Sequence, residues 1–132
     1  MFNPIHRHLL IEADITGGVA TGQQGKDLLV KLVELADMVP VTMPQCVFVE
    51  EEGNEGPTGS INLASSHIAF HQWDETGKLQ LDIYSCKCFN TLKILEFLDT
   101  VFGFRSLNAV LIDRDSLSDM KILGKIHLTD IK

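Results

Sequence analysis

The strongest constraint on the fold is an alternation of apolar and polar side chains on both sides of the segment Asp74-Glu75-Thr76-Gly77. Residues 67–73 and 78–84 both alternate with a period of two, which is typical of half-buried β-strands. A short connection containing glycine joins them, so the sequence predicts an antiparallel hairpin. The apolar side chains share one face, which other elements must cover: Ile68, Phe70, Leu79, Leu81 and Ile83.

The second face of this hairpin collects polar side chains. If Trp73 faces Lys78, then His67 faces Tyr84, and the next pair along the ladder is Ser65 with Cys86. Most side chains on this face are types that transfer protons or bind ligands: His67, His71, Trp73, Gln80, Asp82, Tyr84 and Cys86. A catalytic or ligand-binding face is one interpretation, and a solvated outer face is the other.

Two further site types could use these residues. A cysteine hydrolase would need Cys86 activated by His67 or His71, but no family-type nucleophile signature surrounds this cysteine. A zinc ion could be bound by the two histidines with Cys86 and Cys88, but cysteines two positions apart are closer than structural zinc sites use, so we expect no metal. Cys46 and Cys88 are expected to be buried as small apolar residues.

The other segments predict an α+β two-layer sandwich, a mostly antiparallel sheet with two helices on one face. Helical spacing of apolar residues marks residues 23–38 and 91–102, the second beginning after Asn90 and ending at Gly103. Strands are expected at residues 7–14, 46–49, 60–64 and 107–112, with a loop at 50–59, while residues 115–132 show no clear pattern. We expect residues 1–132 to form a single domain.

Charge and hydropathy exclude several classes of protein. The formal net charge of −7 argues against a nucleic-acid binder, which needs a basic surface, and suits a small cationic substrate. No stretch approaches the roughly 20 apolar residues that span a bilayer. Residues 1–8 are too polar for a signal peptide, and the cysteine count is odd. We therefore expect a cytoplasmic protein with reduced thiols and no membrane association.

The stretch GPTGSINLASSHIAFHQWDE, residues 56–75, resembles the prokaryotic S-adenosylmethionine decarboxylases. That family carries a Gly-x-Ser/Thr-Gly loop, then Leu-Ala-Glu-Ser-His-Ile-Ser-x-His-Thr-Trp-Pro-Glu, then an apolar strand ending Asp-x-Phe-Thr-Cys. The likeness continues without a gap to Cys86 and includes His8-Leu9-Leu10 near the start. Its specific part covers about a third of the chain.

The resemblance implies a proenzyme that cleaves itself between Ser65 and Ser66 into residues 1–65 and 66–132. The Ser66 hydroxyl would attack the Ser65 carbonyl, and elimination would convert Ser66 into a pyruvoyl cofactor. Thr58 would stabilise the intermediate of this reaction, and His71 would remove the Cα proton.

The resemblance also implies a carboxy-lyase that decarboxylates S-adenosylmethionine to the aminopropyl donor for spermidine synthesis. Cys86 would reprotonate the substrate carbon, Glu75 would contact the substrate, and Ser65, His67 and Trp73 are further candidates for substrate binding. A homodimer is implied too, with sheets extended or sites shared across the interface.

Two departures leave alternatives open. The family has a glutamate at the position of Ser65, and an aromatic residue where this chain has the acidic segment 50–55. Ornithine or arginine is therefore an alternative substrate on the same scaffold. An uncleaved, non-catalytic homologue is the third hypothesis.

Overall fold

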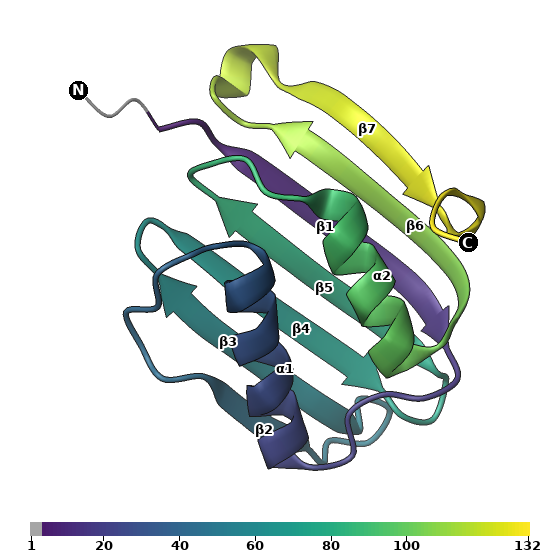
Figure 1. Cartoon of the computed structure of the whole chain (residues 1–132). Coiled ribbons are helices and arrows are strands. Elements are labelled where there is room, and N and C mark those ends of the chain that lie inside the picture. The colour runs from purple at the N-terminus through teal and green to yellow at the C-terminus, as the bar shows by residue number, and fades with distance from the viewer. Residues whose placement is uncertain (1–3) are drawn as a thin grey trace.

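A seven-stranded antiparallel sheet carries both helices on one face (Figure 1). The computed structural model describes residues 4–132. The strands are β1 (Arg7–Ile15), β2 (Gln45–Val49), β3 (Gly56–Leu63), β4 (Ser66–Trp73), β5 (Lys78–Ser85), β6 (Phe104–Asp113) and β7 (Lys121–His127). The helices are α1 (Gly22–Leu35) and α2 (Thr91–Phe102), with 3₁₀ turns at Leu117–Asp119 and Leu128–Asp130. This architecture confirms the predicted α+β two-layer sandwich.

The strand order in the sheet is β2-β3-β4-β5-β1-β6-β7. Strands β2 to β5 follow the chain as a meander, whereas β1 lies between β5 and β6. The predicted register of the β4–β5 hairpin is confirmed, since Trp73 faces Lys78 and His67 faces Tyr84. Side chains that face each other across a ladder project to the same side, so the predicted apolar and polar faces both exist.

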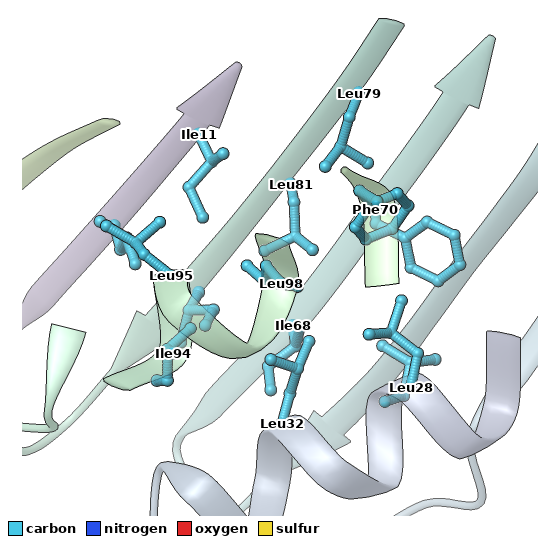
Figure 2. Close-up of a cluster of buried hydrophobic side chains, with 14 of the residues drawn as sticks. Ile11, Leu28, Leu32, Ile68, Phe70, Leu79, Leu81, Ile94, Leu95 and Leu98 are labelled. Carbon is cyan, nitrogen blue, oxygen red and sulfur yellow. The ribbon is translucent and has the colours of Figure 1, made fainter. Parts of the chain in front are cut away.

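The core lies between the sheet and the two helices (Figure 2). Ile68, Phe70 and Leu81 on the sheet and Leu32, Leu95 and Leu98 on the helices are all at most 3% exposed. Each helix begins where the sequence supplies an N-cap. Thr21 Oγ1 accepts from Gln24 N at 3.1 Å, and Asn90 Oδ1 accepts from Lys93 N at 3.1 Å. Helix α2 has the predicted bounds, with Gly103 left-handed at its end.

Helix α1 ends at Leu35, three residues before the predicted end. Asp37 adopts a left-handed φ of 53°. Its N–H bonds the Glu34 carbonyl, while the N–H of Met38 bonds the Val33 carbonyl. This pair of bonds is a Schellman motif, which usually has glycine at the left-handed position. Met38 packs against the core although it lies beyond the helix. The helical spacing of apolar residues therefore extended to residue 38 and predicted too long a helix.

Strand β3 begins at Gly56, so the prediction of a loop through residue 59 was wrong for its last four residues. Their glycines and proline indicated a loop, but all four are paired with β2, and Thr58 and Gly59 are paired with β4 as well. Gly59 faces Phe70 directly, and a Cβ at Gly59 would lie 2.5 Å from the Phe70 ring. Glycine is needed at position 59 because this aromatic ring lies over the strand.

The C-terminal segment, which the sequence did not place, forms β7 at the sheet edge. Its apolar side chains Ile122 and Leu123 are 59% and 47% exposed. Because neither face of β7 is well buried, its sequence does not need to alternate apolar and polar residues. The sequence analysis judged residues 1–8 too polar for a signal peptide, and residues 1–3 of that segment lie outside the residues that the structure describes. Within residues 4–132, neither helix is long and apolar enough to cross a membrane.

Gly59→Ala is expected to destabilise the fold by about 1–3 kcal/mol, because the new methyl group overlaps the Phe70 ring. Urea denaturation measures the change in the free energy of unfolding. Adding Phe70→Leu makes room for the methyl group, so the double variant should lose less stability than the sum of the two single changes. Simple additivity would show that the ring does not require glycine at position 59.

Candidate active site

The Ser65–Ser66 bond lies in the tight turn between β3 and β4. Leu63 is paired with Ser66, which leaves Ala64 and Ser65 as the two turn residues. Ser65 has a left-handed φ of 57°. The bond predicted to be cleaved is thus at the tip of a hairpin, where the backbone changes direction most sharply.

Cys86 contacts this turn in two ways. Its backbone N–H donates to Ser66 Oγ at 3.1 Å, and its Sγ donates to the Ala64 carbonyl at 3.8 Å. The side chain of Ser66 shares the helix-covered face with Ile68 and is only 7% exposed. The structure therefore brings together three predicted site residues, Ser65, Ser66 and Cys86, around one peptide bond.

The other predicted catalytic residues lie at the opposite end of β4. Thr58 faces His71, and a hydrogen bond of 3.1 Å joins Thr58 Oγ1 to His71 Nδ1. His71 follows Ser66 by five strand positions, a separation of about 16 Å at the usual rise per residue. One copy of the chain does not bring this pair to the Ser65–Ser66 bond.

Trp73 and Glu75 belong to that distant end as well. The rings of His71 and Trp73 are 6.2 Å apart between centroids, and Trp73 Nε1 donates to Asn54 Oδ1 at 3.1 Å. This bond ties the tryptophan to the acidic segment 50–55. Glu75 is exposed in the turn after β4. These predicted site residues therefore form two groups at opposite ends of β4.

A third cluster on the open face was missed by the sequence analysis. His8 Nε2 donates to Asp82 Oδ2 at 2.7 Å, and Arg114 Nη1 donates to His8 Nδ1 at 2.9 Å. A guanidinium group can only donate, so Nδ1 of His8 is the acceptor and its proton is on Nε2. Asp82 Oδ2 also lies 3.8 Å from Nε2 of His67, the residue that follows Ser66 in the sequence. The hairpin register placed Asp82 near His67, but no local signal placed β1 beside β5.

A cavity of about 620 Å³ opens on the same face, farther along β5. Glu12, Asp14, Trp73 and Asn108 are among its lining residues, whereas Ser66 and Cys86 are not. Hydrogen bonds from Lys78 and Ser106 lower the pKa of the Asp14 carboxyl group. The cavity thus adjoins the Trp73 end of the site and not the turn.

The remaining thiols differ from each other. Cys46 is only partly buried, where the prediction had it buried; it packs close to Gly25 of α1, and this partial burial raises the pKa of its thiol. Cys88 is exposed after β5, so the prediction that it is buried was wrong. No group of three or more potential ligands in residues 4–132 is arranged to hold a metal ion.

Comparison with known proteins places this site in a family. The family model for S-adenosylmethionine decarboxylase matches residues 10–115, and the protein belongs to that family. An S-adenosylmethionine decarboxylase proenzyme from Clostridium botulinum (strain Langeland) is 38% identical over 54 residues, which are 40% of this chain and 47% of that protein. Another from Thermoplasma volcanium is 50% identical over 32 residues, 24% of this chain and 25% of that protein. The aligned stretches span less than half the length of these curated relatives.

His8→Phe is expected to destabilise the fold by about 1–3 kcal/mol, because Asp82 and Arg114 would each lose a partner in a half-buried environment. His127→Phe is the comparison variant, since His127 is exposed at the sheet edge and its ring bonds Asn108 and caps the adjacent 3₁₀ turn. Loss of these exposed bonds should cost less than about 1 kcal/mol. Urea denaturation of both variants measures the difference, and equal losses would contradict a structural role for the cluster.

Proposed function

We propose that this chain is the proenzyme of a pyruvoyl-dependent S-adenosylmethionine decarboxylase that cleaves itself between Ser65 and Ser66. The observation that carries the proposal is the double contact of Cys86 with the turn, through its N–H to Ser66 Oγ and its thiol to Ala64. The relatives from Clostridium botulinum and Thermoplasma volcanium are proenzymes by name, which supports the same proposal.

Self-cleavage needs a serine hydroxyl beside the preceding carbonyl carbon. A bond forms from Ser66 Oγ to the Ser65 carbonyl carbon, the peptide C–N bond breaks, and the hydroxyl proton ends on the Ser66 nitrogen. A base then removes the Ser66 Cα proton while the Cβ–Oγ bond breaks, and Ser65 leaves as a carboxylate. Addition of water and loss of ammonia complete the conversion of Ser66. Burial of Ser66 keeps water from hydrolysing the ester before elimination.

The residues present fit a pyruvoyl group at position 66. Its carbonyl supplies an electron sink for the carbanion that decarboxylation leaves. The neighbouring Cys86 thiol is a proton donor of suitable chemistry for that carbanion. A catalytic thiol has to stay reduced, so this role also supports a cytoplasmic location.

Two features support S-adenosylmethionine as the substrate. The relatives carry its name, and the sulfonium and amino groups of this compound suit an acidic protein. The segment 50–55 supplies negative charge beside Trp73, which Asn54 holds in place, and a tryptophan face attracts cations. We assign contacts with the substrate to Glu75, Trp73, His67 and Ser65. The product would serve as the aminopropyl donor for spermidine synthesis.

We further propose that the active enzyme is a homodimer with shared sites. Thr58 and His71 are hydrogen-bonded to each other but lie about 16 Å along the strand from Ser66. A second copy would supply the missing pair if its polar sheet face packed against that of the first. A two-fold axis near Ala69, midway along β4, exchanges the two ends of the strand.

The open face has the composition for such packing. It carries the exposed apolar side chain of Leu10 and partly exposed Val110, which face each other on β1 and β6. No element within residues 4–132 covers this face. A stacked pair of sheets would bury these residues and place the Thr58–His71 pair of each protomer over the turn of the other.

Ser66→Ala is expected to abolish cleavage. Intact-mass spectrometry of the wild-type protein should show two fragments of similar size, residues 1–65 and 66–132. The second fragment should be lighter by one ammonia than a serine-initiated chain. Ser66→Ala should give only the uncut mass. An uncut wild-type chain that does not react with carbonyl reagents would overturn the proposal, and cleavage of Ser66→Ala would show that another residue is the nucleophile.

The same preparations test the substrate. Cleaved wild-type protein should release carbon dioxide from carboxyl-labelled S-adenosylmethionine, while Ser66→Ala should release none. Ornithine and arginine, assayed at equal concentration, should be decarboxylated far more slowly. If carbon dioxide is released faster from ornithine or arginine, that amino acid is the substrate in place of S-adenosylmethionine. The proposed self-cleavage would be unaffected by that result.

Shared sites make a separate prediction. His71→Ala homodimers and Ser66→Ala homodimers should both remain uncut. When the two chains are co-expressed, mixed dimers should cleave the His71→Ala chain, because its Ser66 meets the partner's His71. Different affinity tags identify the cut chain by mass. Cleavage of His71→Ala by itself, or an uncut mixture in which mixed dimers are present, would contradict shared sites.

A further inference from the structure

The turn at the cleavage site has an unfavourable conformation for its residues. Two-residue hairpins favour type I′ turns, with positive φ at both central residues, or type II′ turns, with positive φ at the first. Here only the second central residue, Ser65, has positive φ. This position strongly favours glycine or asparagine, because a Cβ crowds the backbone there.

Among residues 4–132, Asp37 is the only other non-glycine residue with positive φ. Asp37 ends helix α1 in a Schellman motif, where the hydrogen bonds of the helix end stabilise that conformation. Ser65 ends no helix. Strain of this kind persists only where the surrounding structure holds it.

The surrounding structure holds the turn from one side through residues 37–42, which we call the strap. Ala64 N donates to the Val39 carbonyl at 2.8 Å, and Val41 N donates to the Asn62 carbonyl at 3.0 Å. Asn62 N donates in turn to Thr42 Oγ1 at 3.1 Å. The strap therefore fixes the backbone on the N-terminal side of Ser65.

Cys86 holds the turn from the other side, through Ser66 Oγ and the Ala64 carbonyl. Lys87, the next residue, connects the two supports, because its ammonium group bonds the Asp37 carbonyl at the start of the strap. The residues on both sides of Ser65 are thus anchored while the peptide bond is intact.

We propose that Ser65 is a positioning residue whose left-handed backbone stores strain that self-cleavage releases. This inference rests on the proposed function. In the acyl shift, the planar Ser65–Ser66 peptide is replaced by a tetrahedral carbon and then by an ester through Ser66 Oγ. Ser65 then no longer needs the left-handed conformation to connect β3 with β4. Strain present in the uncut turn and released in the transition state raises the cleavage rate.

A comparison of Ser65→Gly with Ser65→Ala isolates the backbone effect. Both variants lack the hydroxyl, but alanine keeps the cost of the left-handed conformation and glycine removes it. Ser65→Gly should therefore cleave more slowly than Ser65→Ala, by on the order of tenfold. Cleavage is followed by mass spectrometry after purification of uncut chain. Ser65→Asn, which also tolerates this conformation, should be slower than Ser65→Ala.

A second measurement checks that the strain belongs to the uncut turn. In the uncleavable Ser66→Ala background, Ser65→Gly should have a higher melting temperature than Ser65→Ala. A merely structural role would stabilise the glycine variant without slowing cleavage. A slower rate and a higher melting temperature together support stored strain.

Hydroxylamine locates the affected step. It cuts the ester as soon as it forms, so the rate in its presence reports the acyl shift alone. The difference between glycine and alanine should persist there. If both variants are cut at equal rates, or if hydroxylamine removes the difference, the inference is wrong while the proposed function stands. If the wild-type chain is never cut, the proposed function fails and this inference fails with it.

Discussion

The structure depends on the insertion of β1 between β5 and β6. This strand is hydrogen-bonded on both sides, and without it the sheet would divide into β2–β5 and β6–β7. Its apolar side chains Leu9 and Ile11 are at most 2% exposed beneath the helices. Because β1 comes first in the chain and pairs with segments that come much later, the whole sheet has to assemble together.

The two faces of this sheet have different physical roles. One is covered by α1 and α2 (Figure 1) and contains the apolar core. The other is open and carries the histidines, Asp82, Tyr84 and the Thr58–His71 pair. Ser66 is exceptional, because its hydroxyl lies on the covered face while its peptide bond lies at the end of the sheet. The buried Ser66 hydroxyl and the accessible Thr58–His71 pair thus lie on opposite faces of the sheet.

Predictions from local sequence succeeded where contacts between chain neighbours decide the structure. The hairpin register followed from strand alternation and turn length, and the bounds of α2 followed from Asn90 and Gly103. Predictions failed where tertiary packing overrides local preference. Gly59 lies in a strand because the Phe70 ring covers it, and α1 ends early at a left-handed Asp37. The sequence of the edge strand β7 shows no clear alternation of apolar and polar residues, because little of this strand is buried.

The sequence by itself determined which side chains share a face of the β4–β5 hairpin and that Cys86 lies near the Ser65–Ser66 bond. These relations need only a period of two and a short turn, which are local properties. Tertiary structure alone decided that His8 meets Asp82, since this contact requires β1 to pair with a distant strand. It also decided the conformation of Ser65, because the strap and Cys86 impose on this residue a backbone that its own preference opposes.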